Sequence, residues 1–153
     1  MNLSAPFLCE FFKEPMMKAF PYIDILFSNE TEAAKFSEVQ NFGLTDIKEI
    51  ALKTAALPKK NSKRAAPLSS PRAQTILSWP RVNGKVREFP VTRLAEEKLI
   101  DTNGAGDAFV GGFLAQLVQG QDVAECIKCG IWAATEIIQR PGCSFPPDLH
   151  YKD

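Results

Sequence analysis

The sequence has one histidine and no surplus of charge of either sign. Its 153 residues hold 18 Lys and Arg against 18 Asp and Glu, and His150 is the only histidine. A chain without excess basic charge lacks what drives counterion release from nucleic acid and what anchors a protein on an anionic membrane. We therefore predict no nucleic-acid partner and no membrane partner. We interpret His150, near the C-terminus, as a surface residue rather than a catalyst.

Cysteine is scarce and its spacing is uninformative about metals. The four cysteines do not form two CxxC pairs, and Cys126 and Cys129 form a lone CxxC within an apolar stretch. Without a second pair or a nearby histidine, core packing is favoured over a metal or redox role. A chain of this length can also bury a core without disulfides. We predict reduced thiols, as in the cytosol.

Long hydrophobic runs are absent as well. The longest, residues 22–27 and 108–118, are too short or too interrupted by glycine to span a bilayer, and no charged-then-apolar leader opens the sequence. A cytoplasmic location is expected. The basic run at 59–64 is interpreted as a solvated loop, with a nuclear localisation signal as the alternative.

What the sequence does contain is a mixture of strand-like and helix-like segments. A β-branched and aromatic run at 22–27 suits a buried strand, and residues 1–7 suit the end of another. Helices are predicted over 30–39, from 45 or 46 to 57, over 107–119 and over 122–138, with a further helical face over 8–20 that Pro15 interrupts.

Asn83-Gly84 predicts a hairpin turn. Residues 65–81, which are rich in proline and serine, are predicted to be irregular. This alternation indicates an α/β layered fold with a mostly parallel sheet flanked by helices.

The sharpest motif is Asp101-Thr-Asn-Gly-Ala-Gly-Asp107, between an apolar segment read as a strand end and an apolar helix. Small residues at 104–106 allow a tight turn that presents free N–H groups, and the helix that begins there adds the positive end of its dipole. Such a turn binds anions. An acidic residue at the same place repels an anion unless it takes part in chemistry, so Asp107 is a candidate base. A simple capping role for Asp107 is the alternative.

A second motif, Asn29-Glu-Thr-Glu32, follows the predicted strand at 22–27. Asn29 and Glu32 lie three residues apart at a helix start and share one face. In open α/β sheets, ligands bind beyond the carboxyl ends of the strands. A carboxylate there can hold Mg²⁺ through water. A capping box is the alternative interpretation.

Taken together, these segments resemble the ribokinase-like (PfkB) family of sugar and nucleoside kinases, and within it the branch that phosphorylates adenosine. The stretch from Asp101 to Phe113 resembles the family signature, and further likeness lies at 1–7, 22–33, 46–50, 56–59 and 141–146. The resemblance implies the C-terminal portion of a ribokinase-like domain. It also implies ATP as co-substrate, Mg²⁺, adenosine as acceptor, AMP as product in purine salvage, and a monomeric enzyme.

The resemblance also implies roles for single residues at the phosphate end. Asp107 matches the catalytic base for the ribose 5′-hydroxyl. Asn29 and Glu32 match the motif for Mg²⁺ and phosphate. The residues implied at the nucleotide phosphates are Asn103 and the anion-hole residues Gly104, Ala105 and Gly106.

Three further positions are assigned by the same resemblance. Asp101, with backbone groups at 140–144, matches a monovalent cation region. Phe7 is implied as a wall of the nucleoside site. Ile131 stands where related kinases often have histidine beside the adenine of ATP.

Two departures from the family pattern stand out. The chain has roughly half the family's length, and the N-terminal half with most acceptor contacts is absent. We therefore predict that this chain is inactive on its own.

The second departure is that residues 65–81 stand in place of a strand and a Thr-Gln-Gly turn. If Leu68–Trp79 is back-translated with suitable codons and read from the third base, it gives Val-Phe-Thr-Gln-Gly-Pro-Asp-Asp-Thr-Val-Met, which is typical of the family. Our hypothesis is a compensated frameshift, which sequencing the transcript across these codons tests.

Two alternatives therefore remain beside the nucleoside-kinase interpretation. One is another ribokinase-like sugar kinase, against which the segments at 3–7 and 27–33 argue. The other is a non-catalytic truncated isoform or gene-model fragment that binds ATP poorly or serves a partner. ATP binding by the isolated chain separates the last from the first two.

Overall fold

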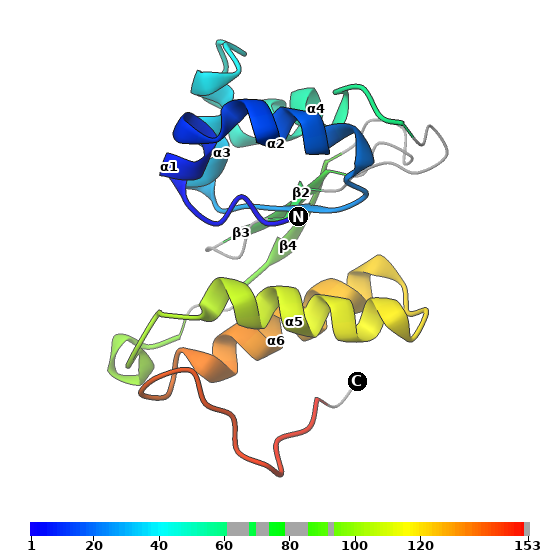
Figure 1. The fold of residues 1–153 in the computed structure, drawn as a ribbon. Coiled ribbons are helices and arrows are strands. Elements are labelled where there is room, and N and C mark those ends of the chain that lie inside the picture. Colours follow the sequence, from blue (N-terminus) through cyan, green and yellow to red (C-terminus); the bar gives the residue numbers. More distant parts are fainter. Residues whose placement is uncertain (61–67, 70–73, 79–85, 92–93, 152–153) are drawn as a thin grey trace. The chain divides into compact units, whose positions relative to one another are not determined.

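The computed structural model describes residues 1–60, 68–69, 74–78, 86–91 and 94–151, in two compact units, Met1–Pro90 and Val91–Asp153 (Figure 1). The first unit contains the helices α1 (Pro6–Phe11), α2 (Lys13–Ala19), α3 (Glu30–Val39) and α4 (Ile47–Ala55), the 3-10 turn η1 (Phe20–Tyr22), and the strands β1 (Leu26–Phe27), β2 (Leu68–Ser69), β3 (Gln74–Ser78) and β4 (Val86–Pro90). The second contains η2 (Glu96–Lys98), α5 (Ala105–Val118) and α6 (Val123–Ile137).

The predicted helices are confirmed with small shifts at their ends. Helix α3 has the predicted bounds and carries acidic residues in its first turn. Asp46 caps α4 by accepting a hydrogen bond from Glu49 N at 3.0 Å. The helical face over 8–20 is two helices, and the break falls at Phe12 instead of Pro15. Pro15 sits in the first turn of α2, where its missing N–H has no helical partner to lose.

The described strands form one sheet in the order β1-β2-β3-β4. Strand β1 pairs in parallel with β2, and Asn2 makes a further parallel bridge to Phe27, which confirms that residues 1–7 include strand-like backbone. Strands β2 and β3 are antiparallel, as are β3 and β4, with Ser78 opposite Val86. Among the described strands the sheet is therefore mixed, and the prediction of a mostly parallel sheet does not hold for them. The hairpin is therefore present, although its predicted turn at 83–84 lies outside the described residues.

The prediction of an irregular stretch over 65–81 is wrong at 74–78, which form β3. Its prolines lie at 67, 71 and 80, outside that strand, so they remove no donor from the β3–β4 ladder. The other residues of this stretch, apart from β2 at 68–69, lie outside the described residues.

The strand predicted over 22–27 is shorter than expected. Only Leu26 and Phe27 are in β1, because Pro21 stands in the first turn of η1 and Tyr22 is 70% exposed. Lys59 holds this turn, with Nζ 3.0 Å from Ile23 O. The interpretation of Lys59 as part of a solvated loop is therefore wrong, since its side chain is half-buried and burial lowers its pKa. Residues 61–64 lie outside the described part of the chain.

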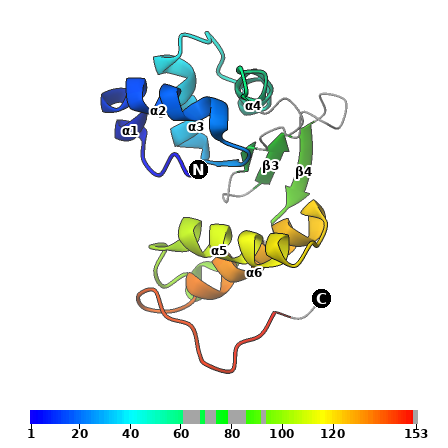
Figure 2. The same cartoon turned by 45° about the vertical axis from the view of Figure 1, so that its right-hand side comes forward.

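Aromatic and aliphatic side chains form the core of the first unit. Phe20 and Phe36 stack with their ring centroids 5.4 Å apart. The fully buried members of the cluster are Leu3, Cys9, Phe20, Leu26, Phe36 and Ala51. Helix α4 lies beside the sheet (Figure 2), and Lys48 on α4 pairs with Glu88 on β4 at 2.7 Å.

In the second unit, α5 and α6 pack closely along their length. A Cβ on Gly112 would lie 2.7 Å from Cys129 O, and one on Gly130 would lie 2.8 Å from Phe109 O. Both glycines therefore permit backbone contact that any side chain would prevent. Cys126 and Cys129 are buried and form no disulfide, which confirms their core role.

No strand is described at Leu99-Ile100, where the sequence predicts one. Both side chains are exposed, and the N–H of Ile100 donates instead to Ile138 O at 2.9 Å, at the end of α6. The pairing with a helix end uses the backbone donors that a strand neighbour would otherwise take.

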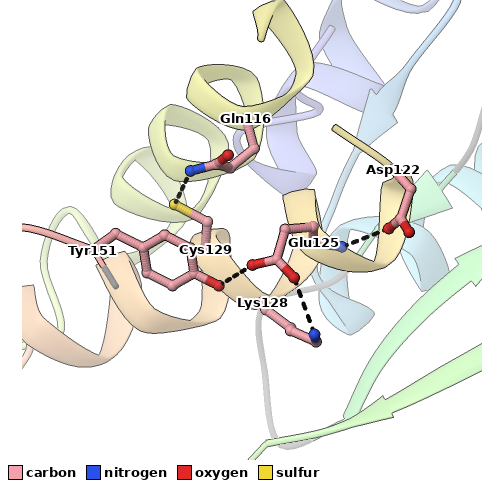
Figure 3. A network of polar contacts seen from close by, with 6 residues as sticks. All are labelled: Gln116, Asp122, Glu125, Lys128, Cys129 and Tyr151. Atoms are coloured by element: carbon pink, nitrogen blue, oxygen red, sulfur yellow. Dashed lines mark hydrogen bonds and ion pairs between the residues drawn. The ribbon is translucent and has the colours of Figure 1, made fainter. Parts of the chain in front are cut away.

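The C-terminal segment returns to α6. The hydroxyl of Tyr151 donates to Glu125, whose carboxylate also pairs with Lys128 at 3.0 Å (Figure 3). The Tyr151 ring also packs on Trp132, with centroids 5.3 Å apart. His150 beside it is exposed, as predicted. Within the described ranges, no helix combines the length and apolarity needed to cross a membrane.

Candidate phosphate-binding site

Residues 101–107, called here the anion turn, lead into α5 through a glycine in an unusual conformation. Gly104 is the N-cap of α5 and has φ of +74°, in the left-handed region. Any other residue would be strained there. A Cβ at this position would also lie 2.5 Å from Cys143 Sγ. Glycine is therefore required at 104 on two separate grounds.

This turn leaves the start of α5 open. The first helical bond runs from Ala108 N to Gly104 O at 2.8 Å, so the N–H groups of Gly106 and Asp107 precede it and have no partner within the helix. Gly104 has no side chain to cap them. In contrast, α3, α4 and α6 are capped by the side chains of Asn29, Asp46 and Asp122. The predicted anion hole at 104–106 thus has unpaired donors and the positive end of a helix dipole.

Asp107 lies in the first turn of α5 and is exposed. The two aromatic residues that follow on the same helix, Phe109 and Phe113, are buried and fix α5 against α6. The carboxylate therefore projects from a rigid base, beside the free N–H groups and open to a reactant. An acidic residue in the first turn also interacts favourably with the helix dipole, so both the general-base and the capping interpretations of Asp107 fit this placement.

Hydrogen bonds fasten the loop after α6 to the anion turn, which brings Asp101 beside the 140–144 segment that the resemblance assigns to a monovalent cation. Asp101 Oδ1 accepts from Asn103 N at 2.9 Å, and Asp101 Oδ2 accepts from Gly142 N at 3.3 Å. Cys143 Sγ lies 3.7 Å from Asn103 O. Residue-by-residue sequence reasoning missed Cys143, because no local pattern indicates that a residue 39 positions away covers a glycine.

The first unit contains the other predicted pair. Asn29 and Glu32 form a full capping box: Glu32 N donates to Asn29 Oδ1 at 2.9 Å, and Asn29 N donates to Glu32 Oε2 at 3.0 Å. The Asn29 amide also donates to Glu32 Oε1 at 2.7 Å. Glu32 is only 5% exposed. Both carboxylate oxygens therefore already serve the start of α3, which limits any metal contact to their remaining lone pairs.

Glu32 also influences a neighbouring thiol. The pKa of Cys9, on α1, is raised first by burial and second by the negative charge of Glu32. The hydroxyl of Ser28, directly before Asn29, is buried and has no hydrogen-bond partner among the described residues. Neither feature has a signal in the sequence, because both depend on packing.

The other two predicted site residues occupy different surroundings. Phe7 lies on α1 and is 55% exposed, so it is free to contact a ligand. Ile131 lies on α6 and is half-buried, and its carbonyl accepts from Thr135 Oγ1 at 2.7 Å. Among the described residues, no group of three or more His, Cys, Asp or Glu could hold a metal ion. A metal here would depend on ligands from a bound phosphate and water.

Comparison with known proteins identifies the relatives of this chain. The family model described as pfkB family carbohydrate kinase matches residues 1–149. Adenosine kinase 1 of Arabidopsis thaliana is 47% identical over 98% of this chain, and the adenosine kinase of Schizosaccharomyces pombe is 40% identical over 95%. The chain spans only 44% and 43% of those two relatives.

Similar solved structures include adenosine kinases and a ribokinase, and the Anopheles gambiae adenosine kinase has a higher identity and TM-score than the ribokinase. A crystal structure of Anopheles gambiae adenosine kinase in complex with P1,P4-di(adenosine-5) tetraphosphate is 54% identical, with a TM-score of 0.87 over 94% of this chain and 42% of that one. A ribokinase from Thermotoga maritima is 28% identical, with a TM-score of 0.66 over 81% of this chain and 38% of that one. The ribokinase-like α/β fold predicted from the sequence is thereby confirmed.

Proposed function

Because the chain belongs to the pfkB family of carbohydrate kinases, we propose that it is the C-terminal portion of an adenosine kinase, a phosphotransferase acting on adenosine with ATP. The observation that carries the proposal is Asp107 in the open first turn of α5, directly after the left-handed Gly104. Adenosine is preferred over a free sugar as the acceptor because this chain is more identical to an adenosine kinase than to a ribokinase. The chain spans less than half of those relatives, so the activity is assigned to the whole protein.

In this proposal Asp107 accepts the proton of the ribose 5′-hydroxyl. The oxygen then forms a bond to the γ-phosphorus of ATP as the bond from that phosphorus to the bridging oxygen of ADP breaks, giving AMP and ADP. The proton leaves Asp107 for water in a later step. The exposed position of the carboxylate allows both transfers.

The anion turn stabilises the charge that the transferring phosphoryl group carries. The free N–H groups of Gly106 and Asp107 and the helix dipole of α5 act on its oxygens, and Asn103 contributes to the same surface. These donors are fixed before the reaction, so they require no reorganisation when charge develops. The repulsion between Asp107 and phosphate is offset by these donors and ends once the carboxylate has taken its proton.

Mg²⁺ would enter with ATP. It neutralises phosphate charge when bound. Because both oxygens of Glu32 accept from Asn29, this pair fits an outer-sphere role, in which Glu32 acts through water while it fixes the start of α3. Asp101 is assigned to a monovalent cation region with the 140–144 loop. Its two bonds to backbone N–H groups mean that its first task is to join that loop to the anion turn.

The remaining assignments follow the resemblance. Phe7 would form part of the adenosine wall and Ile131 would face the adenine of ATP, where an aliphatic side chain offers packing but no hydrogen bond. The whole enzyme would be a cytoplasmic monomer, with the basic residues at 59–64 as the segment to test for nuclear import. AMP formed in this way returns adenosine to the nucleotide pool, which is purine salvage.

A chimaera tests the proposed activity. The part of Arabidopsis thaliana adenosine kinase 1 that this chain does not span would be joined to residues 1–153, and AMP formation from adenosine and Mg·ATP would be followed. We expect adenosine-dependent turnover that ribose does not replace. The same chimaera with Asp107→Asn is the control. Turnover with ribose but not adenosine would indicate a sugar kinase instead.

Binding of ATP by the isolated chain tests the remaining alternative, a non-catalytic isoform or fragment. The open start of α5 predicts that residues 1–153 bind ATP measurably, by calorimetry, even without an acceptor site. A folded chain that binds no ATP, together with an inactive chimaera, would favour a non-catalytic isoform or fragment. The chimaera and the binding measurement therefore test different parts of the proposal.

A further inference from the structure

The loop after α6 touches the anion turn at the one residue whose conformation decides its shape. Cys143 Sγ stands 2.5 Å from the point where a Cβ on Gly104 would lie, and 3.7 Å from Asn103 O. The preceding Gly142 donates its N–H to Asp101 Oδ2 at 3.3 Å. Residues 142 and 143 thus contact the anion turn at its beginning and at its apex.

Glycine permits the left-handed conformation but does not select it. Gly populates positive and negative φ about equally well, so an isolated Gly104 would spend much of its time away from +74°. The surroundings of Gly104 therefore decide: its carbonyl accepts the first helical bond from Ala108 N at 2.8 Å, and the sulfur of Cys143 lies on its other side. The atoms nearest to the position of a Cβ on Gly104, Sγ at 2.5 Å and Cβ at 3.6 Å, both belong to Cys143.

We propose that Cys143 is a positioning residue, whose sulfur, seated against Gly104, selects the left-handed turn that opens the start of α5 to phosphate. The inference rests on the proposed function only in naming phosphate as the ligand. The geometry of the anion turn then depends on the side chain of Cys143, which lies 39 positions after Gly104 in the sequence. Asp101 and Gly142 supply the backbone clamp that keeps the sulfur there.

A reversible change at the sulfur gives the sharpest test. Cys143 is the one exposed cysteine of the four, all of which the structure describes, so methyl methanethiosulfonate should modify it selectively. The Cys143 thiolate attacks the sulfenyl sulfur, a Cys143 S–S–CH₃ bond forms, methanesulfinate leaves, and the thiol proton goes to solvent. Dithiothreitol then restores the thiol. Because Sγ stands 2.5 Å from the position of a Gly104 Cβ, we expect the added S–CH₃ group to move the sulfur off the glycine.

Two measurements on the 153-residue chain read the result. The first is binding of inorganic tripolyphosphate, measured by calorimetry. We expect thiomethylation to weaken this binding about tenfold, because a turn that holds its binding conformation one-tenth of the time loses affinity by that factor. The second is the amide resonance of Gly104 and its coupling to the α-hydrogens, which report φ directly. Both should return to their original values after reduction.

Variants separate positioning from general damage. Cys143→Ala should weaken tripolyphosphate binding and move the Gly104 resonance, Cys143→Ser should restore part of both, and neither should respond to the reagent. Gln121→Ala, at an exposed position between α5 and α6, is the control and should change nothing. Unchanged Gly104 resonances in the thiomethylated chain would overturn the proposal. If the unmodified chain binds no tripolyphosphate, the phosphate assignment fails, and the Gly104 resonance still decides the role of Cys143.

Discussion

Replacing Glu32 by glutamine should destabilise the start of α3, because the buried carboxylate is the acceptor for two separate donors of Asn29. The backbone N–H of Asn29 reaches Oε2 at 3.0 Å and its amide reaches Oε1 at 2.7 Å. A glutamine offers one oxygen and one NH₂ in the same place. One of the two Asn29 donors must then face another donor, whichever way the amide turns.

The magnitude follows from the number of bonds lost. A hydrogen bond to a charged group contributes about 1.5–3 kcal/mol, and Glu32→Gln loses one of two, so we expect a loss of about 2 kcal/mol in local stability. This corresponds to roughly 30-fold faster amide exchange in α3 if exchange follows local opening. Removing a buried charge recovers part of its desolvation penalty, which places the value nearer the lower end of that range.

Hydrogen–deuterium exchange of the Phe36 amide in the middle of α3 is the assay. Glu38→Gln is the matched control, because it makes the same charge change on the same helix in an exposed pair with Lys35, worth at most about 1 kcal/mol. A second readout is the thiol of Cys9, whose pKa should fall toward its ordinary value when the charge of Glu32 is removed.

A double-variant cycle decides whether the two residues act as a unit. Asn29→Ala and Glu32→Gln should be strongly non-additive, since either one breaks the same capping box. Additive effects, or equal exchange rates for the Glu32 and Glu38 variants, would refute this reasoning. In that event the capping box would not account for the stability of the start of α3.

In the chimaera, Asp107→Asn should lower kcat by about 10² to 10⁴ with little change in ATP affinity, because an amide cannot accept the hydroxyl proton; an unchanged kcat would remove Asp107 from the mechanism. Gly104→Ala should abolish tripolyphosphate binding by the chain, since both the positive φ and the contact with Cys143 oppose a side chain, and binding equal to that of the parent would contradict the turn geometry. The free energy of unfolding should be highest below the pKa of an unfolded cysteine, about 8.5, and should fall as pH rises through the raised folded pKa of Cys9. In urea titrations at several pH values, Cys9→Ala should flatten this fall. An unchanged pH dependence would mean that another group causes it. The isolated 153-residue chain should form no AMP above background, because the chain spans only 44% of an active relative, and positioning in a complete site is worth roughly 7–11 kcal/mol of the barrier; steady AMP formation would show that these residues build an acceptor site alone.

Elements whose signals are local were predictable from the sequence. Helix α3 has the predicted bounds because acidic residues, a cap and an apolar face agree over ten residues. The anion turn was recognisable because small residues before an apolar helix favour an open helix start whatever surrounds them. Both are properties of residues within one or two turns of each other.

Predictions failed where distant residues decide the outcome. The run at 22–27 has the composition of a strand, yet Lys59 binds Ile23 O and η1 takes its first part. Leu99-Ile100 resembles a strand end, but the backbone pairs with the end of α6. Composition states what a segment favours, whereas the partner available for its backbone donors decides what it becomes.

The sequence by itself determined the family, the helices and the identity of the candidate base, since these depend on residue type and spacing. Only the tertiary structure decided that Gly142 donates to Asp101 and that Cys143 covers Gly104. The reason is that a hydrogen bond and a close contact are set by three-dimensional distance. For Cys143 that distance is fixed by the packing of α5 on α6, which returns the chain to the anion turn 39 residues after leaving it.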